Sequence, residues 1–278
     1  MSSPAAAPEF LKGHGTENDF VLLPDADDAL DLTAGRVRAL CDRRAGIGAD
    51  GVIRVVPVRD GGPEQFFMDY RNADGSSAQM CGNGARLFAR YLVDAGWAEP
   101  GSIVFRTRGG TRIARVAPVG DVAIDMGPVV LGARSRALAG GREYSGVAVD
   151  VGNPHLVCAG ISDETALASL DLTRRPGFDP EVFPDGVNIE FVTALGAEEV
   201  AMRVHERGVG ETRSCGTGTV AVAAAHLAES GRATGRVAVR VPGGRVTVDI
   251  VPGGSTLIGP AVLVARGHID AEFWAAHR

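Results

Sequence analysis

Two short phrases of the sequence place a cysteine directly before Gly-x-Gly: Met80-Cys81-Gly82-Asn83-Gly84 and Ser214-Cys215-Gly216-Thr217-Gly218. Nearly half of the 278-residue chain separates the two cysteines, so each half of the chain carries one. An alanine-rich run that is typical of a helix follows each phrase. A thiol just before a helix lies among free N–H groups at the positive end of the helix dipole, and both favour the thiolate. We therefore expect two thiols that face each other and act as an acid–base pair.

Such a pair suits inversion at a carbon atom, because a thiolate removes a proton from one face and a thiol returns one to the other. An ordinary thiol pKa of about 8.5, lowered at a helix N-terminus, allows both forms near neutral pH. The α-proton of an amino acid is weakly acidic, so the backbone N–H groups of both helix starts must stabilise the developing negative charge. One such motif alone fits a tight turn with a buried cysteine, but two at duplicate positions favour catalysis.

The composition narrows the class of ligand. The net charge is −6 and no basic run is present, so we expect a small-molecule substrate and no nucleic-acid partner. Lys12 is the only lysine in the chain. A pyridoxal phosphate enzyme needs a lysine for its internal Schiff base, and a single lysine near the N-terminus is a poor candidate. We therefore expect chemistry without this cofactor.

The sequence also carries expectations about location and about the other cysteines. The first nine residues contain no basic residue and no long apolar core, so we expect no signal peptide. No apolar stretch approaches membrane-spanning length, and we expect a cytoplasmic protein with no membrane partner. Cys41 and Cys158 lie in apolar surroundings outside any Cys-x-x-Cys motif, which predicts buried packing residues.

An internal duplication extends along the whole chain. Besides the cysteine phrases, four further pairs of phrases match in order, and the offset between the members of each pair is almost the same as that between the two cysteines. They are Asn18–Val21 with Asn153–Leu156, Asp50–Val52 with Asp185–Val187, Ile103–Gly110 with Val237–Gly244, and Gly127–Leu131 with Gly259–Leu263. Five matches at an almost constant offset indicate two copies of one domain.

Each copy is predicted to have the same order of elements. In the first copy we expect a strand at Phe20–Leu23, a helix at Ala29–Cys41, strands at Val52–Val58 and Gln65–Tyr70, the helix after Cys81, and strands within Ile103–Met126. In the second copy the corresponding ranges are Val147–Val151, Glu164–Leu170, Val187–Val192, Val200–His205 and, after the Cys215 helix, Val237–Val264. The fold class is therefore α/β (α+β), with two pseudo-symmetric domains, each a mostly antiparallel sheet with one central helix. Both helix starts would point into a cleft between the domains, where they suit a carboxylate.

Several polar residues near these motifs have two interpretations each. Arg207 suits a bidentate clamp on a carboxylate, or equally a surface ion pair with Glu206. Asn72, which precedes Glu206 by the same offset as Cys81 precedes Cys215, either contacts substrate or belongs to a turn. His155 either supports a thiol or is a core histidine, and Asn188, on an apolar strand, needs a partner that substrate could supply.

Other sites fit the sequence less well. The cysteine and histidine residues lack metal-ligand spacing, so we expect no metal. No Gly-x-Gly-x-x-Gly follows a strand within a βαβ unit, which argues against dinucleotide binding. A Cys–His hydrolase needs one nucleophile and one base, and does not explain two equivalent cysteines.

With these motifs the sequence resembles the diaminopimelate epimerase family of cofactor-independent amino-acid epimerases. The matching phrases cover the chain almost from end to end. They are Gly15–Phe20, Gly46–Gly51, Tyr70–Ser76, Met80–Arg86, Gly152–His155, Val187–Glu190, Glu206–Thr212 and Cys215–Gly218.

The resemblance implies a role for each candidate residue. Cys215 would accept the proton in the LL to meso direction of 2,6-diaminopimelate epimerisation and Cys81 would donate one, with the roles exchanged in reverse. Further site residues fall into two groups that the resemblance implies. The first group would bind the substrate through the side chains of Asn18, Asn72, Asn153, Asn188 and Arg207, and through the backbone of Gly82-Asn83 and Gly216-Thr217, which would hold the α-carboxylate. The second group, His155 and Glu206, would tune the thiols and the reacting amino group.

The resemblance also implies an architecture and an assembly. Each domain would be a barrel-like sheet around its central helix, without a cofactor, and the chain would form a homodimer. We expect domains at residues 1–126 and 127–261, with the tail 262–278 returning to the first domain. The implied pathway is lysine and peptidoglycan-precursor biosynthesis.

A proline-type racemase of the same fold is the nearest alternative. It usually has His after its first Cys-Gly, where this chain has Asn83, and it lacks the phrase Glu206–Thr212. A non-catalytic binding protein, or a family member that uses a carboxylate base, would be expected to lack one cysteine, and the presence of both cysteines argues against these alternatives. Departures from the family pattern are Ser214, Leu87 and the loop Gly62–Gln65, and none of them bears on a role named above.

Overall fold

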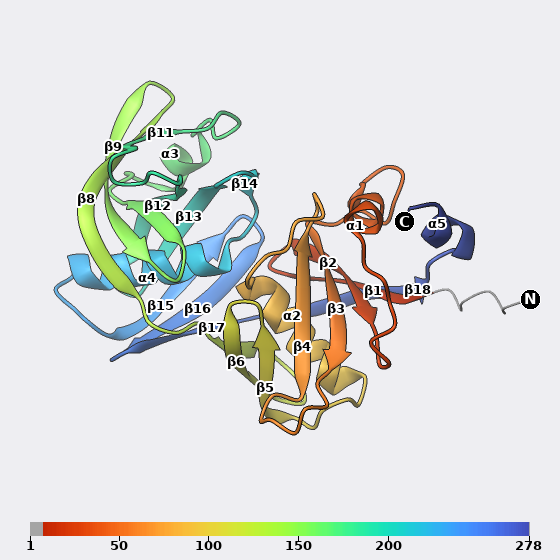
Figure 1. The fold of residues 1–278 in the computed structure, drawn as a ribbon. Helices are drawn as coiled ribbons and strands as arrows, with labels where there is room; N and C mark the ends of the chain where they lie inside the picture. Colours follow the sequence, from red (N-terminus) through yellow and green to blue (C-terminus); the bar gives the residue numbers. More distant parts are fainter. Residues whose placement is uncertain (1–7, 278) are drawn as a thin grey trace, which may run out of the picture. The chain divides into compact units, whose positions relative to one another are not determined.

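The computed structural model describes residues 8–277, which form two compact units with a mixed α/β architecture (Figure 1). Unit 1 comprises the described residues up to Ile124 together with the chain from Pro260 to His277, and unit 2 comprises Asp125–Gly259. Large sheets and few helices confirm the expected fold class. No helix within residues 8–277 is long and apolar enough to cross a membrane.

Unit 1 contains eight strands in the order β18–β1–β2–β3–β4–β5–β6–β7. Only β2–β3 and β4–β5 pair in parallel, so the sheet is mostly antiparallel. The bounds are β1 Glu9–Gly15, β2 Asn18–Pro24, β3 Gly51–Pro57, β4 Phe66–Asn72, β5 Gly101–Thr107, β6 Gly110–Val116, β7 Val122–Asp125 and β18 Val262–His268. In Figure 1 the first strand (red) and the last (blue) are seen side by side.

Unit 2 repeats this arrangement in the order β8–β9–β10–β12–β13–β15–β16–β17. Two short strands, β11 and β14, add to β8 and β13. The bounds are β8 Val130–Ala139, β9 Arg142–Asp150, β10 Pro154–Cys158, β11 Gly177–Phe178, β12 Asn188–Gly196, β13 Glu199–Glu206, β14 Gly210–Thr212, β15 Gly235–Val241, β16 Gly244–Val251 and β17 Gly254–Gly259. In neither unit do the first and last strands of this order pair with each other, so the sheets are curved but open.

The two units share one topology, including the positions of both parallel pairs, which is the structural form of the sequence duplication. The counterpart of β2 is β10, so the expectation that Val147–Val151 matches Phe20–Leu23 was wrong: residues 147–150 of that segment form the end of β9, the counterpart of β1. The ladder register also sets Gly51 opposite Phe20 and Asn188 opposite His155. Gly51 therefore corresponds to Asn188, two residues beyond the match that the sequence suggests.

The chain passes from one unit to the other twice, and each passage leads directly into the outermost strand of the unit that it enters. The phrase Gly127–Leu131 leads from β7 into β8, and the matching phrase Gly259–Leu263 leads from β17 into β18. The strand β18 pairs with β1 from Glu9 to His14. The duplicated phrases are thus the two connections between the units.

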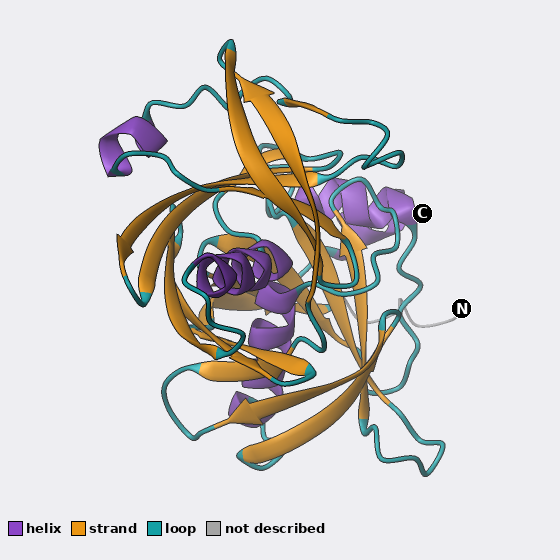
Figure 2. Cartoon of the chain, turned by 90° about the vertical axis from the view of Figure 1, so that its left-hand side faces the viewer, coloured by secondary structure: helices purple, strands orange, loops and turns teal. Residues whose placement is uncertain are grey.

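A long helix lies inside each sheet. These helices are α2 (Gly82–Asp94) and α4 (Gly216–Glu229), and in both of them almost every residue of the first three turns is buried. Figure 2 shows a helix nearly end-on, with curved strands on either side of it. A helix that is covered on all sides needs small or apolar residues all round, which accounts for the alanine-rich sequence.

The remaining helices are short and lie outside the sheets' centres. They are α1 (Ala34–Cys41), α3 (Glu164–Ala168) and α5 (Ala271–Ala276). The first begins five residues later than expected, because the Asp25 carboxylate accepts hydrogen bonds from the N–H groups of Ala29 and Leu30 and holds that segment out of a helix. Thr33 then caps α1 through its hydroxyl.

Apolar clusters fill the space between the sheets and these helices. Cys41 lies in a cluster with Val21, Leu40 and Val52 in unit 1, and Cys158 lies in one with Leu156 and Phe191 in unit 2. Burial raises the pKa of each of these two thiols to about 12. Both cysteines are therefore inert packing residues at neutral pH.

Gly84, in the first turn of α2, allows this helix to lie close to the sheet. A Cβ atom there would come within 2.9 Å of Ile53 Cδ1 and 3.1 Å of Met68 Cε, both in the core. We expect Gly84→Val to lower the free energy of unfolding by about 2 kcal/mol or more through overpacking. Gly196→Ala, where a Cβ meets nothing within 4 Å, is the control and should change it by less than about 1 kcal/mol. Denaturant unfolding measures both, and equal effects would contradict the close approach.

Candidate active site

Both candidate cysteines occupy the same place at the start of a buried helix. Cys81 and Cys215 are the N-cap residues of α2 and α4, with extended backbones (φ −137° and −122°). Their carbonyl groups accept the first helical hydrogen bonds, from Ala85 N at 2.8 Å and from Thr219 N at 3.0 Å. The helices thus begin directly after each cysteine, as the sequence predicts, and each thiol lies beside the backbone N–H groups of the first helical turn.

The thiol of Cys81 belongs to a short hydrogen-bonded chain in unit 1. Cys81 Sγ lies 3.5 Å from Asn18 Oδ1, and Asn83 Nδ2 donates to the same oxygen at 3.1 Å. The amide of Asn18 in turn donates to Asp50 Oδ2 at 2.7 Å. The structure therefore brings three sequence-predicted residues together, and their partner Asp50 fixes which way the Asn18 amide points.

A group of charged residues contacts Asp50, at the end of this hydrogen-bonded series, and the neighbouring Asp19. Arg43 Nη2 contacts Asp19 Oδ1 and Asp50 Oδ1, each at 2.7 Å, and Lys12 Nζ contacts Asp19 Oδ2 and the Gly48 carbonyl. Burial disfavours the charged form of Asp19, but hydrogen bonds from Arg43 and Lys12 outweigh it and lower its pKa to about 2. The single lysine of the chain is thus engaged in supporting the strand that carries Asn18.

Asn72 lies at the end of β4, in a tight turn. Its amide donates to Ser76 Oγ at 3.0 Å, and its backbone carbonyl accepts from Gly75 N at 2.9 Å. The contacts of Asn72 in unit 1 are therefore those of a turn residue, which is one of the two interpretations that the sequence allows.

The thiol of Cys215 in unit 2 is in a more buried and more acidic environment. Burial raises its pKa well above the ordinary thiol value, and the nearby carboxylates of Glu206 and Glu190 raise it further. The Thr217 hydroxyl lies 3.6 Å from Cys215 Sγ. Cys215 is therefore held as a thiol, whatever its helix start contributes.

Glu206, at the end of β13, faces this thiol. Burial raises the pKa of its carboxyl, although hydrogen bonds from the Thr212 hydroxyl and the Cys215 thiol act in the opposite direction. The position corresponds to Asn72 in unit 1, so a carboxylate stands here in place of an amide.

A buried His–Glu pair supports the same helix start. His155 Nδ1 lies 2.7 Å from Glu190 Oε1, and His155 Nε2 lies 3.1 Å from Asn153 Oδ1. A Cβ on Gly218 would stand 2.7 Å from Glu190 Oε1 and 3.4 Å from Cys215 Sγ, so the carboxylate reaches the first turn of α4. His155 thus orients Asn153 rather than filling an apolar core.

Asn188 and Arg207 are joined through the backbone. Asn188 Oδ1 accepts from Arg207 N at 2.8 Å, and its amide nitrogen lies 3.4 Å from the Pro154 carbonyl. The Arg207 guanidinium donates to the Asp185 carbonyl at 3.0 Å. The partner that Asn188 requires on its apolar strand is therefore supplied by the protein itself.

The sequence motifs gave no role to three buried or half-buried residues that lie around the two helix starts. Asp50 orients Asn18, Glu190 lies against the first turn of α4, and Arg86 lies wholly buried in α2. All three fall within phrases that carry the family resemblance, which is the one signal that marked them. The three departures noted above concern packing and a loop: Ser214 and Leu87 are buried, and Glu64 in Gly62–Gln65 accepts from Thr111 Oγ1.

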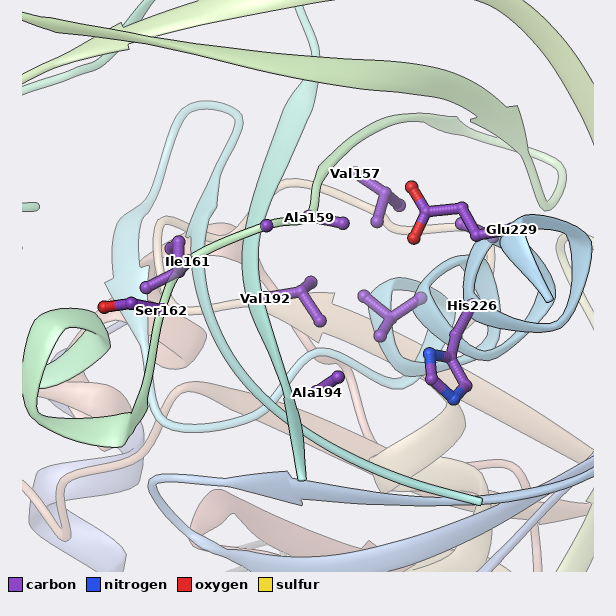
Figure 3. Close-up of a pocket in the computed structure, with 11 residues that line it drawn as sticks. Val157, Ala159, Ile161, Ser162, Val192, Ala194, His226 and Glu229 are labelled. Atoms are coloured by element: carbon purple, nitrogen blue, oxygen red, sulfur yellow. The ribbon is translucent and has the colours of Figure 1, made fainter. Parts of the chain in front are cut away.

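A separate cavity of about 260 Å³ lies in unit 2, at the far end of α4 (Figure 3). Mostly small apolar side chains such as Val157, Ala159 and Val192 line it, with His226 and Glu229 from α4. No candidate site residue lines this cavity. Within residues 8–277 no group of His, Cys, Asp and Glu is arranged to hold a metal ion.

Comparison with known proteins gives a consistent result. The family model described as diaminopimelate epimerase matches residues 10–132 and 147–267. The chain is 51% identical over 284 residues to a diaminopimelate epimerase of Rhodococcus opacus, covering 96% of this chain and 98% of that protein. It is 52% identical over 285 residues to a diaminopimelate epimerase of Mycobacterium bovis, covering 96% and 99%.

Solved structures with lower sequence identity share the fold. A phenazine biosynthesis protein of the PhzF family from Enterococcus faecalis has a TM-score of 0.71 at 13% identity, covering 95% of this chain and 99% of that one. A hydroxyproline epimerase from Agrobacterium vitis has a TM-score of 0.69 at 16% identity, covering 95% and 93%. At these identities the likeness concerns the fold alone.

Removal of the charge on Glu206 should favour the thiolate of Cys215. We expect Glu206→Gln to raise the rate of Cys215 alkylation at pH 8 by about three- to tenfold, because a like charge no longer opposes ionisation. Glu211→Gln is the matched control, since this exposed carboxylate pairs with Arg203. Iodoacetamide labelling read by peptide mass spectrometry gives the rates. An unchanged rate in Glu206→Gln would show that the carboxylate does not act on the thiol.

Proposed function

The chain belongs to the diaminopimelate epimerase family, and on that premise we propose that it interconverts LL- and meso-2,6-diaminopimelate with Cys81 and Cys215 as its two acid–base groups. The observation that carries the proposal is the equivalent placement of both thiols as N-caps of buried helices. The reaction belongs to lysine and peptidoglycan-precursor biosynthesis.

The two thiols divide the proton transfer between them. For the LL to meso direction Cys215 accepts the α-proton and Cys81 donates one to the opposite face, and the roles exchange in reverse. The contrast between the two environments supports one thiol acting as the acid and the other as the base, because the two must differ in protonation at the moment of reaction. We propose domains at residues 1–126 with 262–278 and at 127–261, each of which carries one of the two thiols.

Polar groups around each helix start bind the substrate in this proposal. The N–H groups of Gly82-Asn83 and Gly216-Thr217 hold the reacting α-carboxylate, because helix N-termini attract anions. The proposed side-chain ligands are Asn18, Asn72, Asn153, Asn188 and Arg207. Support comes from the fixed orientation of four of them: Asn18 is held by Asp50, Asn72 by Ser76, Asn153 by His155, and Asn188 by the backbone of Arg207.

The protein itself, rather than the ring of a pyridoxal phosphate cofactor, stabilises the negative charge that develops at the α-carbon. Preorganised N–H donors at two helix starts can supply this stabilisation. Lys12 is engaged with Asp19 and the Gly48 carbonyl, which supports a structural role for it. His155 and Glu206 complete the site by tuning Cys215 and receiving the reacting amino group.

Proline-type racemisation is the second candidate, because the fold is shared with a hydroxyproline epimerase. The side chain after the first Cys-Gly favours diaminopimelate. Asn83 donates to Asn18 Oδ1, so the two amides form one set beside Cys81.

The family resemblance also leads us to propose a cytoplasmic homodimer. Exposed apolar side chains on β8 and β18 support an interface between copies: Val130, Leu131, Leu138, Val262 and Val264. Light scattering should give twice the chain mass of 28.8 kDa. A monomer at micromolar concentration would remove this part of the proposal.

Loss of either proposed acid–base thiol should abolish epimerisation. We expect Cys81→Ala and Cys215→Ala each to lower kcat by about 1,000-fold or more, because each substitution removes the group proposed to carry the proton on one face of the α-carbon. Cys158→Ala, which removes a packing thiol in unit 2, should keep most of the activity. Exchange of the α-proton in deuterated water, with LL-diaminopimelate compared against proline, is the assay. Near-wild-type turnover in either variant would refute the two-thiol mechanism, and exchange of proline alone would favour the second candidate.

A further inference from the structure

Asp50 carries a carboxylate to which the proposed reaction gives no role, yet it determines how an amide faces Cys81. Its Oδ2 accepts from Asn18 Nδ2 at 2.7 Å and from the Asp19 backbone N–H at 3.2 Å. Its Oδ1 accepts from Arg43 Nη2 at 2.7 Å, and the same nitrogen lies 2.7 Å from Asp19 Oδ1. Both oxygens of the Asp50 carboxylate are therefore held in place.

The chemistry of these groups sets the orientation of the Asn18 amide. A carboxylate only accepts hydrogen bonds, so the amide nitrogen of Asn18 must face Asp50. The amide oxygen is then directed to the other side, where Asn83 Nδ2 donates to it at 3.1 Å and Cys81 Sγ lies 3.5 Å away. A reversed amide would set its oxygen against the carboxylate, and two acceptors repel each other.

The Asn18 oxygen can serve Cys81 only as a hydrogen-bond acceptor. It has two lone pairs, and the Asn83 amide occupies one of them. The contact with the sulfur is a hydrogen bond only if the cysteine supplies the proton, since a thiolate has none to donate. The Asn18 oxygen thus favours the thiol form of Cys81, because a hydrogen bond to the neutral form disfavours ionisation.

Charged groups around Cys81 act in both directions. Arg86, buried on α2, favours the thiolate, as do the N–H groups of the helix start. The Arg86 guanidinium donates to the Pro260 carbonyl and the Thr16 hydroxyl, so the orientation of the Asn18 amide is left to Asp50. The other charged groups of this region either pair with one another or are exposed to solvent: Lys12 on β1, Asp19 on β2, Arg43 after α1, and Glu17 in the turn between β1 and β2.

The duplicate asparagine in unit 2 is held at the other end of its amide. By ladder register Asn18 corresponds to Asn153, and Asn153 Oδ1 lies 3.1 Å from His155 Nε2. Its oxygen therefore faces an imidazole, whereas the oxygen of Asn18 faces a thiol. The same register places the buried, apolar Val187 at the position of Asp50. A carboxylate that orients this asparagine is thus a feature of unit 1.

We propose that Asp50 is a positioning residue: through the Asn18 amide it keeps Cys81 as a hydrogen-bonded thiol in the resting protein. This deepens the proposed function and rests on it for its meaning in catalysis, because Cys81 is the proposed proton donor in the LL to meso direction. The free protein then already holds the acid for this direction. Once Cys81 has given up its proton, the Asn18 oxygen has lost a donor, which favours the return of a proton to the same cysteine.

The protonation of Cys81 can be observed without turnover, so this inference and the proposed function fail separately. Protonated thiols give S–H stretching bands in the infrared spectrum, and the difference between the full-length wild type and Cys81→Ala at pH 7 isolates the band of Cys81. We expect this band to be present and shifted to lower frequency, because the S–H group donates a hydrogen bond. A difference spectrum without an S–H band would show a thiolate and overturn the proposal.

A double-mutant cycle then tests whether Asp50 acts through Asn18. In Asp50→Asn the Asn18 amide can turn and offer an N–H to the sulfur, so the apparent pKa of Cys81 should fall by about one unit or more. The thiolate at pH 7 would then rise about tenfold. Iodoacetamide labelling of the Cys81 peptide between pH 5 and 10 gives this pKa. In an Asn18→Ala background the same change should move the pKa much less, because the amide that carries the effect is missing.

Asp19→Asn is the matched control, since it removes one carboxylate from the same group of charges and leaves the contact between Asp50 and Asn18 in place. Equal falls of the Cys81 pKa in Asp50→Asn and Asp19→Asn, or an equal effect of Asp50→Asn with and without Asn18, would indicate charge alone and overturn the assignment. If Asp50→Asn does not fold, the infrared band decides: Asn18→Ala should return it to higher frequency, and an unmoved band would contradict the contact with the amide.

Discussion

The start of a buried helix is the constraint on which both halves of this protein depend. Each cysteine gives its carbonyl group to the first helical hydrogen bond, so its position is fixed by the helix rather than by its own side chain. The helix in turn is fixed because the sheet surrounds it and leaves its first three turns without solvent. A side chain held on a rigid backbone is what acid–base chemistry requires, since proton transfer depends on short, stable distances.

Around this shared frame the two units differ mainly in charge. Phe20 and Ile53 lie in the core of unit 1, and their counterparts His155 and Glu190 form a buried polar pair in unit 2. Arg86 and Val220 differ in the opposite sense. These exchanges keep the topology and the burial of the helix, because the side chains around it adjust to fill the same space. They change the electrostatic environment of the thiol, which burial makes strong by excluding water.

The sequence alone was sufficient for the duplication, the helix starts and the class of fold. Cys-Gly-x-Gly appears twice, and the other repeated phrases lie at nearly the same offset. The two units have the same strand order, as this duplication predicts. It was insufficient where one segment resembles two strands: Val147–Val151 is as apolar as β10, and only the pairing with Pro154–Val157 identifies it as part of β9. Arg86 and Glu190 were equally hard to identify, because a charged residue in a helix or strand normally faces water and their burial depends on contacts from distant segments.

The charge difference between the units has a consequence for the proposed two-thiol reaction. Two uncoupled thiols with one shared pKa would adopt a given thiolate–thiol combination in about a quarter of molecules at best. If their pKa values differ by about two units, the same combination reaches about 80% at the midpoint pH. A duplicated domain that kept both environments identical would therefore hold most molecules in unproductive protonation states. Glu206 and Glu190 raise the pKa of Cys215, whereas their counterparts in unit 1 are the uncharged Asn72 and Ile53, so the two thiols do not share one electrostatic environment.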